Sequence, residues 1–166
     1  MVSALQGVTH LPGAFVISAM SGIESNAVQT QRSEHQGRSL QYVFVPDADS
    51  WRKAFDSDKN AHERHEFLNS MLPEFRCARR SRTKICALVH KPTVTRLVLG
   101  VVRGLLDREA IDMQSVGICL VSPANGEIHN LETLEQLITQ LKLTSIRTFE
   151  GREAIDSFLN GTALGH

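Results

Sequence analysis

The chain has 166 residues, of which 42% are hydrophobic and 22% are charged, and its 18 basic residues equal its 18 acidic residues. This composition is typical of a folded globular protein and excludes an intrinsically disordered chain. Because the formal net charge is zero, the chain has no overall attraction to nucleic acid or to an anionic membrane.

The N-terminal part of the chain predicts two strands joined by a long loop. A run of strand-forming residues at 13–20 follows a Pro-Gly break, and a second run at 40–45 ends at Pro46. Proline cannot donate a hydrogen bond to a strand ladder, so the second strand should end there. Residues 21–39 between the two runs carry few large apolar side chains and are expected to form a loop.

The rest of the chain alternates between patterns typical of helices and of buried strands. Helices are predicted where apolar residues recur every three or four positions, and strands where short apolar runs are continuous. The predicted helices cover residues 51–72 with a break at 56–60, 92–108, 131–141 and 151–160, and the predicted strands cover 84–90, 116–121 and 145–149.

The predicted fold class is therefore α/β, with the order ββαβαβαβα and helices packed against a mixed sheet. Strands that alternate with helices need right-handed crossovers and parallel pairing, whereas the two consecutive early strands permit an antiparallel pair. We expect one domain over residues 13–161, with a flexible N-terminus at 1–12 and a tail at 162–166.

The sequence shows no signal for export or membrane insertion. The first 20 residues lack a basic start, and no stretch reaches the roughly 18 consecutive apolar residues of a membrane span. We therefore expect no membrane span and a cytoplasmic location. The three cysteines, Cys77, Cys86 and Cys119, lack metal-site spacing, and we interpret them as reduced core thiols.

The end of the chain carries a resemblance to a known family. The strand Ile146-Arg-Thr-Phe leads directly into Gly-Arg-Glu-Ala-Ile-Asp-Ser-Phe-Leu. This segment, together with the element order over residues 84–160, resembles the STAS fold of anti-sigma-factor antagonists and its divergent STAS-like relatives. The resemblance implies a non-enzymatic regulatory module that docks a protein partner, such as a kinase or an anti-sigma-like regulator.

The resemblance also implies candidate phosphorylation sites. In phosphorylatable STAS domains, the third strand leads to an Asp-Ser or Asp-Thr pair at the start of the next helix. The corresponding stretch here is His90-Lys-Pro-Thr-Val-Thr-Arg, so Thr93 and Thr95 are the candidates, although no Asp precedes them. A phosphate on Thr93 would lie beside a helix N-terminus, which favours negative charge.

Basic residues suggest where a partner would bind. We expect the helix surface from Thr93 to Arg103 to contribute Arg96 and Arg103. The sharpest charge cluster is Arg76, Arg79, Arg80, Arg82 and Lys84, of which Arg79, Arg80 and Arg82 are the further candidates for an acidic partner. The cluster also fits a plain solvated connector, and without interleaved aromatic residues it does not predict nucleic-acid binding.

A second hypothesis is a small enzyme or ligand-binding domain that uses the carboxyl ends of strands. Its candidate residues are Asp47, Asp49, His90 and Ser122. With Lys91 these acids also suggest a degenerate receiver domain, but such a domain would have a helix where residues 21–39 lack helical periodicity. No phosphate-binding, dinucleotide-binding or nucleophile-elbow motif is found, so enzyme activity stays open but less expected.

Two further possibilities are weighed against plainer interpretations. His62 and His65 stand at a spacing found in some metal sites, but their charged surroundings favour a solvated helix face. We expect no metal and no cofactor. His129 is too isolated to assign. A third hypothesis is a subunit whose charged surfaces serve assembly, and the sequence does not fix the oligomeric state.

Overall fold

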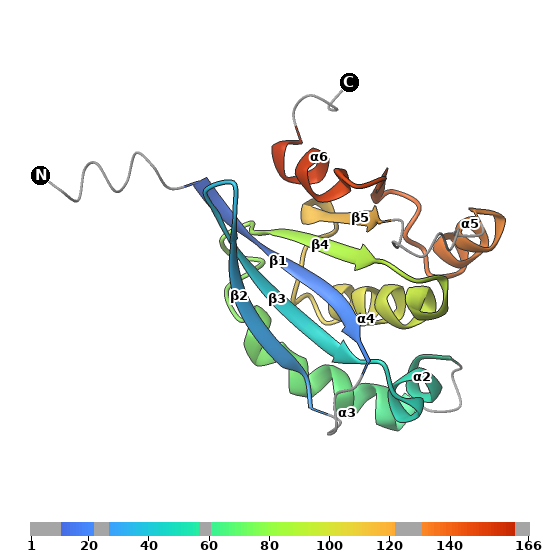
Figure 1. Cartoon of the computed structure of the whole chain (residues 1–166). Coiled ribbons are helices and arrows are strands. Elements are labelled where there is room, and N and C mark those ends of the chain that lie inside the picture. Colours follow the sequence, from blue (N-terminus) through green and yellow to red (C-terminus); the bar gives the residue numbers. More distant parts are fainter. Residues whose placement is uncertain (1–10, 22–26, 57–60, 122–130, 162–166) are drawn as a thin grey trace, which may run out of the picture.

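The computed structural model describes residues 11–21, 27–56, 61–121 and 131–161, which form one six-stranded sheet with helices on both faces (Figure 1). Across the sheet, the strands follow the order β2-β3-β1-β4-β5-β6. The strands are β1 (Leu11–Met20), β2 (Gln29–His35), β3 (Arg38–Pro46), β4 (Lys84–Val89), β5 (Val116–Leu120) and β6 (Arg147–Glu150). The helices are α2 (Asp49–Asp56), α3 (Ala61–Met71), α4 (Thr95–Asp107), α5 (Leu131–Gln140) and α6 (Ala154–Asn160).

The mixed α/β sheet predicted from the sequence is confirmed. Strands β1, β3, β4, β5 and β6 pair in parallel, and β2 and β3 form the antiparallel pair. The short turns Leu72–Phe75, Pro92–Val94 and Met113–Ser115 are 3-10 helices. Among the described residues, no helix is long and apolar enough to cross a membrane.

Side chains alternate between the two faces of the sheet and build two cores. On one face, Ile17 and Ile85 join a large core with α2, α3, α4 and α5, and on the other, Val16 and Cys86 join a smaller core with α6. Figure 1 shows α6 on the side of the sheet opposite α3 and α4. Because β4 and β5 are covered on both faces, they have the continuous apolar runs that identify them in the sequence.

The predicted loop at 21–39 is wrong, because it contains strand β2. This strand pairs with β3 from Gln29↔Phe44 to His35↔Arg38, and Gln36 and Gly37 form the two-residue turn. Both turn residues have positive φ, at 53° and 81°, which matches the twist that a tight hairpin requires. The strand lies at the sheet edge and its side chains are mostly exposed, so it carries no apolar pattern.

The hairpin also corrects the predicted order and pairing. The early strands at 13–20 and 40–45 were expected to permit an antiparallel pair, but β1 and β3 are parallel, with Ala14 opposite Leu40. Strand β2 runs antiparallel to β3, and the chain reverses direction at the turn between them, so β3 runs in the same direction as β1. The observed order is βββααβαβαβα, and β1 begins at Leu11, inside the predicted flexible segment 1–12.

The second half follows the prediction closely. Strand β4, helix α4, strand β5 and helix α6 occupy the predicted ranges to within a few residues. Gly161 ends α6 with a φ of 61°, and its N–H donates to the carbonyl of Ser157. Helix α2 ends at Asp56 and α3 begins at Ala61, and residues 57–60 of the predicted break lie outside the described part of the chain. Cys86 and Cys119 are buried as predicted, but Cys77 is exposed, because it lies in the turn before β4 rather than in a strand.

Candidate docking site along helix α4

Helix α4 is divided into a buried face and a face that carries basic residues. Its apolar side chains recur every three or four positions and pack against the sheet and the neighbouring helices, which stabilises the helix in this position. Arg96, Gly100, Arg103 and Asp107 recur at the same spacing and therefore share one side of the helix. Gly100 and Gly104 add no side chain there, so the neighbouring helices approach closely.

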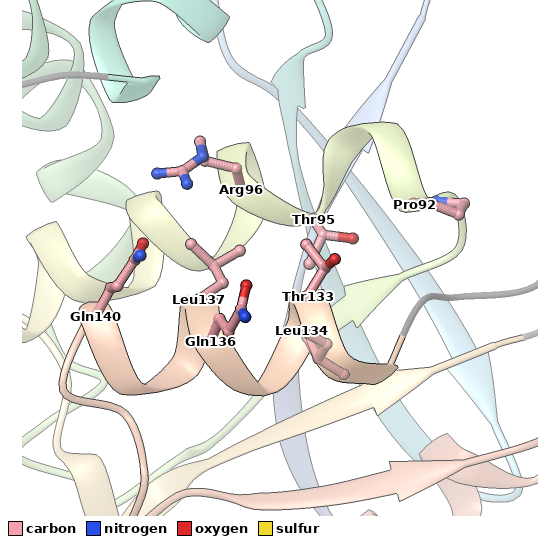
Figure 2. A pocket seen from close by; sticks show the side chains of 8 residues that line it. All are labelled: Pro92, Thr95, Arg96, Thr133, Leu134, Gln136, Leu137 and Gln140. Atoms are coloured by element: carbon pink, nitrogen blue, oxygen red, sulfur yellow. The ribbon is translucent and has the colours of Figure 1, made fainter.

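The first hollow on this side lies between α4 and α5 and has a volume of about 190 Å³. Figure 2 shows Thr95 and Thr133 at the end nearer Pro92, and Arg96 and Gln140 towards the other end. Leu134 and Leu137 of α5 supply apolar surface between them. The hollow therefore offers an apolar floor with hydroxyl, amide and guanidinium groups at its edges.

The second hollow lies farther along α4 and has a volume of about 250 Å³. Arg96 lines both hollows, so together they follow the helix, and we call this surface the α4 groove. The second hollow has four arginines, Arg64, Arg96, Arg103 and Arg108, against one carboxylate, Asp107. This part of the groove carries net positive charge.

The arginines of the α4 groove are held by named contacts. Arg103 donates to the carboxylate of Asp107 at 3.0 Å and to the carbonyls of Leu141 and Lys142, both at 3.2 Å. Arg64 donates to the carbonyl of Ala54 at 3.3 Å. The Arg103 guanidinium therefore joins the C-terminal end of α5 to α4, where a cation is favourable.

Arg108 reaches across to α3. Its guanidinium is 2.6 Å from Nδ1 of His65, while His62 forms an ion pair with Glu66 at 3.1 Å on the same helix. Both histidines are exposed, as expected of a solvated helix face. Among the described residues, no group of three or more His, Cys, Asp or Glu side chains could hold a metal ion.

The two phosphorylation candidates differ in accessibility. Thr93 lies in the 3-10 turn before α4 and is exposed. Thr95 is only 9% exposed, and its hydroxyl donates to the carbonyl of Lys91 at 3.4 Å. Thr95 also lines the first hollow, whereas Thr93 does not. Of the two, Thr93 is the one that is exposed to solvent.

The basic connector lies apart from the α4 groove, at the amino end of β4. Arg79 pairs with Glu109 at 3.5 Å, so one member of the connector reaches the end of α4. Arg80 and Arg82 are exposed, and their side chains form no ion pair within the described ranges. The partner residues predicted from the sequence thus fall on two surfaces: Arg96 and Arg103 line the groove, and Arg79, Arg80 and Arg82 do not.

The alternative ligand site is only partly assembled. Asp47 and His90 follow β3 and β4, whose carboxyl ends meet at one edge of the sheet. The Asp47 carboxylate, 5% exposed, accepts hydrogen bonds from Arg52 at 2.6 Å and Ser21 at 3.1 Å. It is therefore occupied by structural contacts.

The other members of that alternative site stand apart. Asp49 is exposed at the start of α2. His90 lies 3.5 Å from the hydroxyl of Ser18, a residue only 2% exposed. Ser122 and His129 lie outside the described residues, so their place relative to this edge is not described. No contact joins Asp47 to His90 in the part of the chain that the structure describes.

Two arginines of the α4 groove were not among the candidate residues of the sequence analysis. Arg64 lies on α3 and Arg108 follows α4, so only the packing of the helices brings them together. No local spacing could have joined them. The glycine pair Gly100 and Gly104, four residues apart within an apolar helix, was the available signal of close helix packing.

No known protein-family model matches this chain, and a search of curated proteins finds no match. The resemblance to STAS domains therefore stays a prediction from the sequence.

Proposed function

We propose that this protein is a non-enzymatic, STAS-like regulatory module that docks an acidic segment of a protein partner in the α4 groove. The observation that carries the proposal is a pair of small hollows along α4 that share Arg96, the second of which is lined by four arginines. Positive charge at the rim selects acidic side chains, and buried apolar surface supplies affinity.

The size of the hollows favours a peptide segment over a small molecule. Their volumes are about 190 and 250 Å³, whereas small-molecule pockets usually enclose roughly 300–1,000 Å³. Each hollow can hold one or two side chains of a bound segment. A helix surface with successive side-chain hollows is a common way to recognise a peptide.

The position of Thr93 suggests how docking would be controlled. Thr93 lies three residues before Arg96, in the 3-10 turn that leads into α4. Phosphorylation would add about −1.5 to −2 charge beside the groove. That charge would compete with the partner's carboxylates for Arg96 and weaken docking.

The experiment is affinity purification of the tagged chain from its own cells, compared across charge variants. We expect a stoichiometric partner with the wild-type chain and at least a roughly tenfold lower recovery with the Arg96→Glu/Arg108→Glu double variant. Arg80→Glu is the matched control, because it reverses one exposed charge outside the groove. Equal Trp51 emission in all chains would show that the variants fold alike.

Two results would oppose the proposal. A partner recovered equally by the wild type and the groove variant would place docking elsewhere. A partner lost with Arg80→Glu but kept by the groove variant would assign docking to the basic connector.

A further inference from the structure

A second basic surface lies at the amino end of the sheet, where β1, β3 and β4 begin (Figure 1). An open hollow of about 630 Å³ occupies this edge. Four basic side chains line it: Arg32 of β2, Arg38 of β3, Arg82 of the turn before β4, and Lys84 of β4. No carboxylate lines it among the described residues, so the hollow concentrates positive charge in a chain of zero net charge.

Two of the four cations are held by groups at the C-terminal end of α6. The ammonium of Lys84 donates to the carbonyls of Leu159 at 2.7 Å and Phe158 at 3.2 Å. A lysine ammonium has three N–H donors, so these two bonds leave one further donor. The guanidinium of Arg38 donates to the side-chain carbonyl of Asn160 at 3.5 Å. The end of α6 therefore positions two of the four charges.

Arg82 lies in a turn that is held by hydrogen bonds. Its backbone has a positive φ of 53°, a conformation that non-glycine residues adopt at a cost. The turn is held by the Thr83 N–H bond to Ala78 at 3.0 Å and by the Ser81 hydroxyl bond to Cys77 at 2.6 Å. Ser81 and Thr83 also line the hollow, and their two hydroxyls are hydrogen-bonded to each other at 2.9 Å, which further fixes the turn beside Arg82.

The charges also act on one another. The pKa of the Lys84 ammonium lies below its usual range. Burial is the larger cause and the positive charge of Arg38 is the smaller one. Like charges that line one hollow repel, so gathering four of them there carries an electrostatic cost. A bound anion would remove the repulsion and raise the pKa of Lys84 again.

We propose that this hollow binds a small anion carrying more than one phosphate group. Arginine presents paired N–H donors that match the geometry of phosphate oxygens. Four cations exceed what a single carboxylate or phosphate requires, and the volume falls within the range of small-molecule sites. The proposal is independent of docking in the α4 groove.

The test is calorimetric titration of the whole chain with inorganic tripolyphosphate. We expect saturable binding at one site, weakened about tenfold or more by the double variant Arg38→Gln/Arg82→Gln. Arg76→Gln is the matched control, since Arg76 belongs to the same connector but does not line the hollow. Arg96→Gln should leave tripolyphosphate binding unchanged, which separates this site from the groove.

Three outcomes would overturn the proposal. The first is that no heat of binding is observed at roughly 1 mM tripolyphosphate. The second is that Arg76→Gln lowers the affinity for tripolyphosphate as much as the double variant does, and the third is that the double variant leaves this affinity unchanged. A single-stranded oligonucleotide that bound more tightly than tripolyphosphate, with the same variant profile, would assign a nucleic-acid surface and would also overturn the small-anion proposal.

Discussion

The substitution Gly117→Ala tests how α6 covers the sheet. Gly117 lies on β5 directly under Phe158, and an added Cβ would lie 2.4 Å and 2.5 Å from Cδ1 and Cε1 of that ring. Carbon atoms in contact stay roughly 3.5–4.0 Å apart, so the ring would have to retreat by about 1 Å. Phe158 is only 8% exposed and its ring packs 5.6 Å from that of Phe149, which leaves it little room.

The expected cost is that of overpacking a core, about 1–3 kcal/mol of unfolding free energy. The entropy that alanine removes from the unfolded chain offsets about 0.4–1 kcal/mol of this cost. For a chain of this size, each kcal/mol lowers Tm by about 2–4 °C. The assay is urea unfolding followed by the fluorescence of Trp51, the single tryptophan.

A second variant separates the clash from other effects. In a Phe158→Leu background the smaller side chain should accept the new methyl, so Gly117→Ala should cost less than about 0.5 kcal/mol there. Stabilisation by Gly117→Ala in the wild-type chain, or an equal cost in both backgrounds, would refute the packing of α6 on β5.

Trp51 is fully buried, and its ring centroid lies 4.4 Å from that of Phe67. Trp51→Ala should therefore lower the free energy of unfolding by about 3–5 kcal/mol, measured by urea unfolding followed by circular dichroism. A loss of unfolding free energy below about 1 kcal/mol would contradict this packing. The pKa of Tyr42, the single tyrosine, is raised mainly by burial and to a smaller extent by its electrostatic interaction with Cys86. Its contribution to stability is therefore present below its unfolded pKa of about 10 and lost as pH rises through the higher folded pKa. An ultraviolet titration should show the folded phenol ionising above the unfolded one, and coincident curves would refute this. Only Cys77 should react promptly with a thiol reagent in the folded chain, with Cys86 and Cys119 reacting after unfolding, and rapid reaction of all three would contradict their burial.

The sequence predicted the second half of the fold well because burial leaves a pattern in it. Strands β4 and β5 are apolar on both faces, and α4 has one continuous apolar face, so their residues reveal both element type and approximate length. The order of strands across the sheet is different, because it depends on which strands pair rather than on any local pattern. The placement of β1 between β3 and β4 was not predictable from periodicity.

Strand β2 was missed for a physical reason. Its residues Gln-Thr-Gln-Arg-Ser-Glu-His are polar on both faces, because an exposed edge strand is held by backbone pairing with β3 rather than by apolar burial. Gln36-Gly37 was the signal of a two-residue turn, but glutamine is a weaker indicator there than asparagine or aspartate. Charged and polar side chains on an edge strand also discourage pairing with other chains.

The candidate sites were only partly predictable. Arg96 could be assigned to a helix surface because helical spacing fixes its face. Arg64 comes from α3 and joins it only through packing between α3 and α4, whereas Arg108 caps the C-terminal end of α4 itself. Arg32 and Arg38 share the basic hollow with Lys84 because β2, β3, β1 and β4 follow one another across the sheet. Convergence of distant residues depends on topology, and a single sequence carries no direct record of it.

The most direct test of docking in the α4 groove is site-specific photo-crosslinking of the complex with the recovered partner. A benzophenone side chain at Gln136, which lines the first hollow, should form an adduct with a segment of the partner rich in Asp and Glu. The same group at Gln114, an exposed residue outside the groove, should form none. Adducts from position 114 alone, or from position 136 to a segment without acidic residues, would contradict the account.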